Sequence, residues 1–319
     1  MTELLIFNKI TPQMRARLEG DFAASDWADV DPDPWIDAHC ESVRFILTDG
    51  PTGVPNEVLE SLPNVEVISN LGVGYDGVDT HIALARGIPV SHTPGVLDQE
   101  VANTTVMLYL ACWRNFEAEM ALARTGRWGD HGNLPLPHSP DGRVIGILGL
   151  GRIGKAIAAK LTPWARKILY HGRSKQDVPY AYHPDLVEMA AACDALINIS
   201  PGGTGTYRLI NREVMDAIGP SGVLINVGRG STVDESALIE ALEAGTLGKA
   251  GLDVFENEPD IPERLRRLPN ATLLPHVASA SIETRAAMGD LAVDNLIAWK
   301  ERRTLITPVP ETASLLCGR

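Results

Sequence analysis

The run VIGILGLGRIG, residues 144–154, joins an apolar stretch to a turn with three glycines, and the stretch KAIAAKL follows at 155–161. This is the order strand, tight turn, helix. The first glycine permits a sharp turn, the second lets a pyrophosphate approach the backbone, and the third lets helix and strand pack closely. Free N–H groups at the start of the helix favour an anion. The run predicts a dinucleotide site in mid-chain. The alternative is a turn whose glycines are required only for the packing of helix and strand.

Length and composition suit a cytoplasmic protein of two domains. The chain has 319 residues, of which 45% are hydrophobic and 22% charged, and its formal net charge is −13. That charge disfavours nucleic acid and anionic membranes as partners. No apolar run is long enough for a membrane helix, and the N-terminus lacks the basic region of a signal peptide. The four cysteines lack the spacing of disulfides or of a metal site, so we expect no bound metal.

Apolar runs alternate with helical stretches on both sides of residue 100. In front of it, we expect a surface loop over 25–34, strands over 4–7, 43–47, 65–69 and 88–90, and helices over 12–18, 55–61 and 80–86. Behind it, strands are expected over 144–148, 167–170, 195–199, 223–227, 249–252 and 271–274. This rhythm is typical of parallel sheets covered by helices.

Long helices are expected over 100–115 and 282–300, the second crossing back onto the front portion of the chain. The predicted fold is α/β, with two doubly wound parallel-sheet domains. A Rossmann cofactor domain, residues 101–283, is inserted into a discontinuous, flavodoxin-like substrate domain made of residues 1–100 and 284–319.

The residues after the second strand of the Rossmann unit bear on the choice of dinucleotide. An NAD site usually carries an acid there, which binds the ribose 2′-hydroxyl. This chain reads YHGRSK over 170–175, with Gly172 at that place. Without the carboxylate, a 2′-phosphate is not repelled, and Arg173, Ser174 and Lys175 can bind it. We therefore expect NADP(H) to be preferred over NAD(H); the alternative is an ordinary basic loop.

Three polar residues follow apolar strand ends in the back half: Arg229, Glu258 and His276. In a doubly wound sheet, ligands bind at the carboxyl ends of the strands. Reduction of a 2-oxo acid needs a cation for the carboxylate, a proton donor for the carbonyl oxygen, and a group that orients the donor. Arg229, His276 and Glu258 can fill these roles in that order.

With these residues the sequence closely resembles the D-isomer-specific 2-hydroxyacid dehydrogenases, and within them the glyoxylate/hydroxypyruvate reductase branch. The resemblance covers nearly the whole chain. Besides residues 149–154, it rests on NVGRG at 226–230 with VDESAL at 233–238, GLDVF at 251–255 with EP at 258–259, and PHVASA at 275–280. It implies that Arg229, Glu258 and His276 form the catalytic set.

The resemblance also implies binding residues. The substrate would contact Arg229, His276 and the loop Leu71, Gly72, Val73 and Gly74, where the N–H groups of Val73 and Gly74 would cradle its carboxylate. Thr105 would face the nicotinamide, Asp253 its carboxamide, and Pro201 and Thr206 the adenosine and phosphate side. The other implied cofactor contacts are Gly149, Gly151, Arg152, Ile153, Gly154, Val227, Gly228, Arg229 and His276.

One region limits what the resemblance carries over, and two others bear on the oligomeric state. The loop SPGGTGT, residues 200–206, departs from the family's Pro-Leu-Thr-Pro-like segment, which puts its cofactor contacts in doubt. The segment 126–142 and the helix 100–115 exceed what one doubly wound domain needs, and relatives usually form two-fold dimers there, so we expect a homodimer.

The sequence therefore predicts an NADPH-preferring reductase of small 2-oxo acids such as glyoxylate and hydroxypyruvate. One alternative is an enzyme for a bulkier, aromatic 2-oxo acid, or an NAD-linked dehydrogenase. Another is a dinucleotide-sensing interaction protein, because some co-repressors resemble this family.

Overall fold

A computed structural model describes residues 2–317, and the chain divides into two compact units. The first contains the residues up to Leu97 together with those from Ser281 onward, and the second is Asp98–Ala280. Each unit is built on one sheet, of five strands in the first and seven in the second, and all strand pairs are parallel. The predicted α/β class with two parallel sheets is confirmed.

The sheet of the first unit has the strand order β2-β1-β3-β4-β5, so the direction of winding reverses between β1 and β3 as in flavodoxin-like folds. Its elements are β1 (Leu4–Ile6), α1 (Pro12–Glu19), β2 (Ala24–Asp26), α2 (Pro32–His39), β3 (Phe45–Asp49), α3 (Asn56–Ser61), β4 (Val67–Leu71), α4 (Thr80–Ala85), β5 (Val90–Ser91) and α13 (Ile282–Arg302).

The loop expected over 25–34 is wrong at both ends. Strand β2 extends to Asp26, and α2 begins at Pro32. Proline fits the first turn of a helix because its missing N–H would have no partner there. The strand was missed because it is three residues long, lies at the sheet edge and is only partly buried, so it carries no apolar run.

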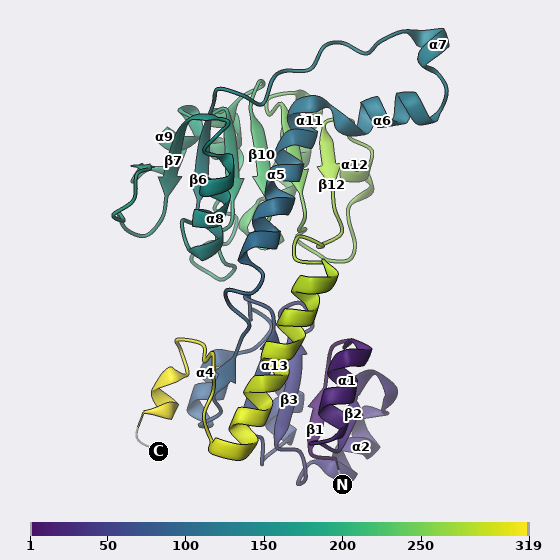
Figure 1. The fold of residues 1–319 in the computed structure, drawn as a ribbon, viewed down its shortest axis with the longest axis vertical. Helices are drawn as coiled ribbons and strands as arrows, with labels where there is room; N and C mark the ends of the chain where they lie inside the picture. Colours follow the sequence, from purple (N-terminus) through teal and green to yellow (C-terminus); the bar gives the residue numbers. More distant parts are fainter. Residues whose placement is uncertain (1, 318–319) are drawn as a thin grey trace. The chain divides into compact units, whose positions relative to one another are not determined.

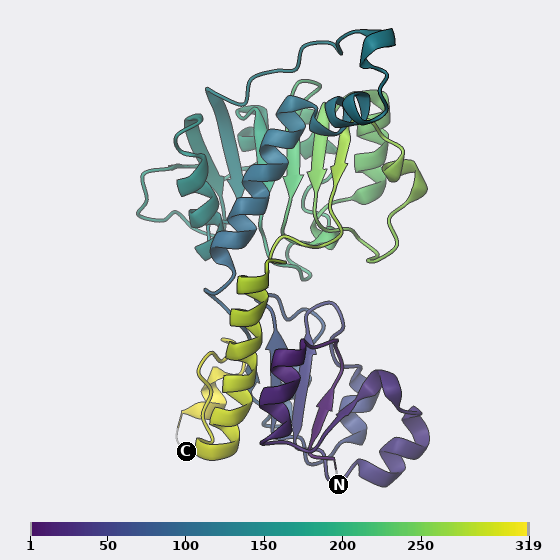
Figure 2. The ribbon, with the colours of Figure 1, turned by 45° about the vertical axis from the view of Figure 1, so that its right-hand side comes forward.

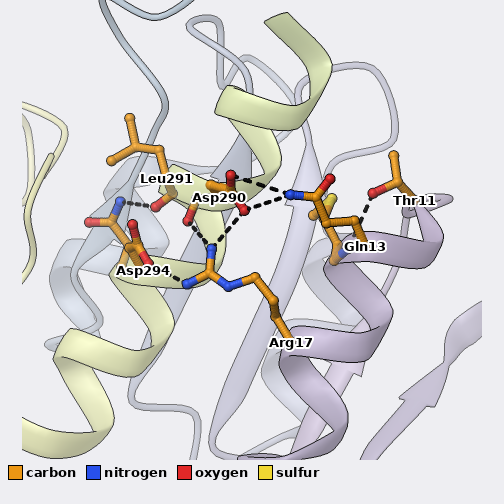
Figure 3. Close-up of polar contacts among 8 residues, drawn as sticks. Thr11, Gln13, Arg17, Asp290, Leu291 and Asp294 are labelled. Carbon is orange, nitrogen blue, oxygen red and sulfur yellow. Dashed lines mark hydrogen bonds and ion pairs between the residues drawn. The ribbon is translucent and has the colours of Figure 1, made fainter. Parts of the chain in front are cut away.

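Helices α1 and α13 cover one face of this sheet (Figure 1). Met14 and Leu18 of α1 and Leu296 and Trp299 of α13 are buried against the apolar side chains of β1, β3 and β4. Figure 3 shows the polar rim of this contact, where Arg17 reaches two acids of α13. The last long helix of the chain is thus part of the first unit's core.

The sheet of the second unit has the order β12-β11-β10-β9-β6-β7-β8, so β6, which precedes the glycine turn, lies beside the point where the winding reverses. Its elements are α5 (Asp98–Arg114), α6 (Phe116–Arg124), α7 (Trp128–His131), β6 (Arg143–Leu148), α8 (Arg152–Leu161), β7 (Ala165–His171), β8 (Ala181–Tyr182), α9 (Leu186–Ala191), β9 (Ala195–Asn198), α10 (Arg212–Ile218), β10 (Val223–Asn226), α11 (Glu235–Ala244), β11 (Lys249–Leu252), α12 (Glu263–Arg266) and β12 (Ala271–Leu273). Six of the seven strands were predicted; β8 has only two residues and was not.

Helices cover both faces of this second sheet. Helices α5 and α8 lie on one face, with α5 running across it (Figure 2), while α9, α10 and α11 pack on the other around a large apolar core. Helices α6 and α7 and the extended segment after them project from the sheet (Figure 1). Over residues 2–317, no helix is both long enough and apolar enough to cross a membrane.

Candidate active site

The glycine turn has the geometry that a pyrophosphate site requires. Gly149 has φ +97°, a conformation that favours glycine, and a Cβ on Gly154 would lie 2.1 Å from the carbonyl oxygen of Gly149. A Cβ on Gly151, by contrast, would meet no atom within 4 Å. Among residues 2–317, no side chain caps the start of α8 at Gly151, which leaves the N–H groups of its first turn available to an anion. The residues present therefore fit a dinucleotide.

The segment after β7 is open and basic. Arg173, Ser174 and Lys175 are exposed, and Gly172 directly follows the end of the strand at His171. A Cβ on Gly172 would meet no atom within 4 Å. The glycine is therefore not required by packing, and an acidic side chain would fit in its place.

Arg229 follows β10 in a turn that is packed on two sides. A Cβ on Gly228 would lie 2.7 Å from the carbonyl oxygen of Ser200, and one on Gly230 would lie 1.9 Å from the backbone of Phe255. The turn thus sits against the carboxyl ends of β9 and β11. Nη1 of Arg229 donates to the carbonyl oxygen of Gly228 at 2.7 Å, and the guanidinium charge helps to lower the pKa of Glu258.

Glu258 and His276 form a hydrogen-bonded pair at the edge of the sheet where the strands have their carboxyl ends. Glu258 follows β11, and His276 follows β12. The Glu258 Oε2 atom lies 2.6 Å from Nδ1 of His276, and Oε1 accepts the Phe255 N–H at 3.0 Å. Burial acts to raise the pKa of Glu258, but the hydrogen bond and charge of His276 outweigh it and hold that pKa below its usual value. Because a carboxylate only accepts, Nδ1 carries the hydrogen, and Nε2 is the atom that can exchange a proton.

Asp253 anchors the loop that carries His276. Its carboxylate is fully buried and accepts the N–H groups of Val277 at 2.8 Å and Ala278 at 2.9 Å, while its carbonyl oxygen accepts the N–H of His276. His276 itself has φ +52°, which is uncommon for a residue with a side chain. Burial raises the pKa of Asp253 above its usual value, against these two hydrogen bonds. The second unit thus brings together Arg229, Asp253, Glu258 and His276.

In the first unit, the loop after β4 presents backbone donors. The carbonyl oxygens of Gly72 and Gly74 accept from the Asn70 side chain, and that of Val73 contacts Nδ1 of His92 at 3.0 Å. Within residues 2–317, the N–H groups of Val73 and Gly74 donate to no hydrogen-bond acceptor. Leu71 closes the strand, and Gly72 has φ +154°.

Comparison with known proteins identifies the family. The sequence model described as "D-isomer specific 2-hydroxyacid dehydrogenase, NAD binding domain" matches residues 106–278. The chain belongs to the D-isomer specific 2-hydroxyacid dehydrogenase family. It is an NAD(P)-dependent oxidoreductase of that family, as the resemblance predicted.

This dehydrogenase is similar over most of its length to several reductases. It is 41% identical to glyoxylate/hydroxypyruvate reductase A of Arabidopsis thaliana over 89% of the chain and 90% of the relative. It is 43% identical to hydroxyphenylpyruvate reductase of Plectranthus scutellarioides over 84% of the chain and 86% of the relative. The solved NADPH-dependent glyoxylate/hydroxypyruvate reductase of Sinorhizobium meliloti, in complex with NADP and malonate, is 46% identical, with a TM-score of 0.91 and coverage of 98% and 97%.

The remaining predicted cofactor residues of the dehydrogenase lie in four places of the second unit. Thr105 is buried in α5, where its hydroxyl donates to the carbonyl oxygen of Val101 at 2.7 Å. Val227 is buried after β10, while Arg152 and Ile153 open α8. The loop 200–206 closes on itself, because the Thr206 hydroxyl donates to the carbonyl oxygen of Pro201 at 2.7 Å. The contacts of all these residues with a cofactor stay predictions.

Sequence reasoning missed the polar residues beneath Arg229. Asn198, Ser200, Asn226 and Thr232 are buried in the dehydrogenase and hydrogen-bonded to one another. Their only signal in the sequence is that polar residues close two apolar strands, and such residues also occur at the ends of ordinary strands.

Proposed function

We propose that this dehydrogenase reduces small 2-oxo acids, glyoxylate and hydroxypyruvate among them, to 2-hydroxy acids. The observation that carries the proposal is the pair of His276 and Glu258 beside Arg229 at one sheet edge. Relatives whose names state these two substrates match nearly the whole chain. When bound, the dinucleotide would supply the hydride that this reaction needs.

Each member of the set has a separate role in the proposal. Arg229 would hold the substrate carboxylate through a charge-assisted hydrogen bond. Nε2 of His276 would donate a proton to the carbonyl oxygen as it gains negative charge. Glu258, held ionised by its lowered pKa, would keep the imidazole in the tautomer and orientation for that transfer. In the first unit, the N–H groups of Val73 and Gly74 would donate to the carboxylate.

The proposal includes a preference for NADPH over NADH. Gly172 leaves the end of β7 without a carboxylate, and the exposed Arg173, Ser174 and Lys175 directly follow it. One similar structure is named as NADPH-dependent. A 2′-phosphate would gain charge-assisted hydrogen bonds at this place, whereas a 2′-hydroxyl would meet no acid.

A homodimer is also part of the proposal. Phe116, Trp128 and Leu136, in the segment that projects from the second sheet, are 56%, 62% and 94% exposed. Large apolar side chains gathered on one projecting segment are typical of a surface that another protein covers. A second copy would bury them.

The experiment is a comparison of kcat/KM for glyoxylate, hydroxypyruvate and hydroxyphenylpyruvate, each with NADPH and with NADH. The proposal predicts the highest values for the two small acids with NADPH. A higher value for the aromatic acid would favour the function named in the Plectranthus relative. If no 2-oxo acid in a wider panel consumes either dinucleotide, the proposed activity is wrong.

A further inference from the structure

Four buried polar side chains form one network beneath the Arg229 turn. Asn198 closes β9, Ser200 follows it, Asn226 closes β10, and Thr232 lies in the short 3₁₀ turn Gly230–Thr232. Their residues are at most 4% exposed. Nδ2 of Asn198 donates to Oδ1 of Asn226 at 2.9 Å and to Oγ1 of Thr232 at 2.6 Å, while its Oδ1 accepts the Ser200 hydroxyl at 2.6 Å.

The network ends on the backbone of Arg229. Nδ2 of Asn226 donates to the carbonyl oxygen of Arg229 at 3.0 Å, and the Thr232 hydroxyl donates to the same oxygen at 2.5 Å. Oδ1 of Asn226 also accepts the N–H of Gly228 at 3.1 Å. The Asn226 amide therefore bonds to both ends of the turn, at Gly228 and at Arg229. The Thr232 hydroxyl adds a second hydrogen bond to the Arg229 carbonyl oxygen.

Both sides of the turn are also closed sterically. The backbone of Gly228 lies against Ser200, and that of Gly230 lies against Phe255, with no room for a Cβ at either place. Within this packing, the hydrogen bonds from Asn226 and Thr232 determine how the peptide between Arg229 and Gly230 is rotated. That rotation sets the direction in which the Arg229 side chain leaves the backbone.

A polar network in a buried place costs free energy of desolvation unless its members satisfy one another, as they do here. Apolar side chains would fill the same space without that cost, so stability alone gives weak reason for four polar residues. A guanidinium, however, binds a carboxylate through a planar fork whose direction matters. A displacement of about 1 Å is enough to weaken such a contact strongly.

We propose that Asn226 and Thr232, held by Asn198, are positioning residues that orient Arg229 toward the substrate carboxylate. The inference rests on the proposed function of Arg229. It predicts that loss of either hydrogen bond to the Arg229 carbonyl weakens substrate binding while the chemical step is retained, because a misdirected guanidinium loses affinity for substrate and transition state alike.

The first test uses Thr232→Val, which keeps the side-chain shape and removes the hydroxyl, and Thr232→Ser, which restores a hydroxyl. Malonate, the dicarboxylate present in the Sinorhizobium meliloti structure, serves as the unreactive ligand. We expect Thr232→Val to raise KM for hydroxypyruvate and the inhibition constant of malonate by roughly threefold to tenfold, which is the effect of one lost hydrogen bond. Its kcat should stay within about twofold of the wild type. Thr232→Ser should recover most of the loss.

Asn226→Ala is the stronger variant, and Asn270→Ala is its matched control. Asn270 is also in the second unit, and its side chain also donates to the backbone, in this case to the carbonyl oxygens of Leu242 and Gly248. It lies before β12 rather than after a strand. We expect both variants to lower the melting temperature. Only Asn226→Ala should raise KM for hydroxypyruvate and the inhibition constant of malonate. Binding of NADPH, followed by its fluorescence, should be unchanged in Thr232→Val.

A double-mutant cycle separates positioning from plain structural support. In an Arg229→Ala background, Thr232→Val should change the malonate inhibition constant by less than about twofold, because the group on which it acts is gone. Equal effects of Thr232→Val with and without Arg229 would overturn the inference but leave the proposed function standing. If Arg229→Ala itself leaves both constants unchanged, the proposed role of Arg229 is wrong, and the inference is overturned with it.

Discussion

Nδ1 of His276 lies 2.6 Å from Oε2 of Glu258, although Glu258 follows β11 and His276 follows β12. The two strands are parallel neighbours, so their carboxyl ends share one edge of the sheet. The carboxylate determines which imidazole nitrogen carries the fixed hydrogen, and it leaves Nε2 for proton transfer. A residue's place after its strand, rather than its distance along the chain, decides whether it joins the site.

Removal of the imidazole should slow the chemical step far more than it weakens cofactor binding. We expect His276→Ala to lower kcat for hydroxypyruvate by about 10²–10⁴-fold, the usual contribution of a general acid. Glu258→Gln should cost less, since the amide can still contact the ring. The affinity for NADPH, titrated by fluorescence, should fall by far less than kcat in both variants. An unaltered kcat in His276→Ala would show that the proton comes from elsewhere.

The lowered pKa of Glu258 predicts a specific dependence of stability on pH. A carboxyl whose folded pKa lies below its unfolded value stabilises the fold above the unfolded pKa, and this stabilisation is lost as pH falls through the folded pKa. The melting temperatures of the wild type and Glu258→Gln should therefore differ most near neutral pH and converge in acid. The measurement is calorimetry at a series of pH values. A difference that is constant with pH would contradict this assignment.

Substitution of Gly172 should change the dinucleotide preference without harm to the fold. Gly172→Asp introduces the carboxylate that binds a ribose 2′-hydroxyl and repels a 2′-phosphate, and the place has room for it. We expect kcat/KM with NADPH to fall by about tenfold to a hundredfold. The ratio of kcat/KM with NADPH to kcat/KM with NADH should fall further. Gly172→Ala is the control, which should leave the ratio near that of the wild type. Equal losses with Ala and Asp would point to sterics rather than charge.

Arg17 should stabilise the first unit through α13. Its guanidinium lies 2.6 Å from Asp294 and 2.8 Å from Asp290, and these hydrogen bonds, the one to Asp294 foremost, raise the pKa of Arg17 (Figure 3). Because the side chain is one-third exposed, we expect Arg17→Met to cost only about 0.5–1 kcal/mol, and less at high salt. It would leave two acids one helical turn apart without the cation that lies between them, although Gln13 would still donate to Asp290. Thermal unfolding at two salt concentrations measures the loss.

The matched control for Arg17 is Arg264→Met. Arg264 lies 2.6 Å from Glu243, but its side chain is 62% exposed, and we expect no measurable change in melting temperature. Because the shortest distance is 2.6 Å in both cases, a larger effect at Arg264 than at Arg17 would contradict the expectation that burial governs the strength of these pairs.

Charged residues on the projecting segment should prevent dimer formation. We expect Trp128→Glu with Leu136→Glu to sediment as a monomer at a concentration where the wild type is a dimer, because burial of a charge in an apolar contact is strongly unfavourable. Ile306→Glu is the control, since Ile306 is 52% exposed and lies in the first unit. A wild-type protein that sediments as a monomer would contradict the proposed homodimer.

Much of the fold was predictable because its signals are local. Alternating apolar runs located most strands, although β3, β4 and β5 begin two residues later and end one or two residues later than expected. Buried polar residues, Thr48, Asn70 and Ser91, extend their ends. The short strands β2 and β8 carry too few residues for a pattern and could not be found in this way. In the site, the places of Arg229, Glu258 and His276 were predictable, since each follows an apolar strand. Their catalytic roles stay predictions.

The sequence alone determined that a glycine turn follows β6, because backbone conformation at Gly149 and close approach at Gly154 depend on residue type. It also determined which side chains close the strands. Only the tertiary structure decided which of them meet. The contact between Glu258 and His276, the anchoring of the His276 loop by Asp253, and the network from Asn198 through Asn226 and Thr232 to Arg229 all depend on strand order. Segments distant in the chain come within hydrogen-bonding distance only when the parallel strands that carry them lie side by side.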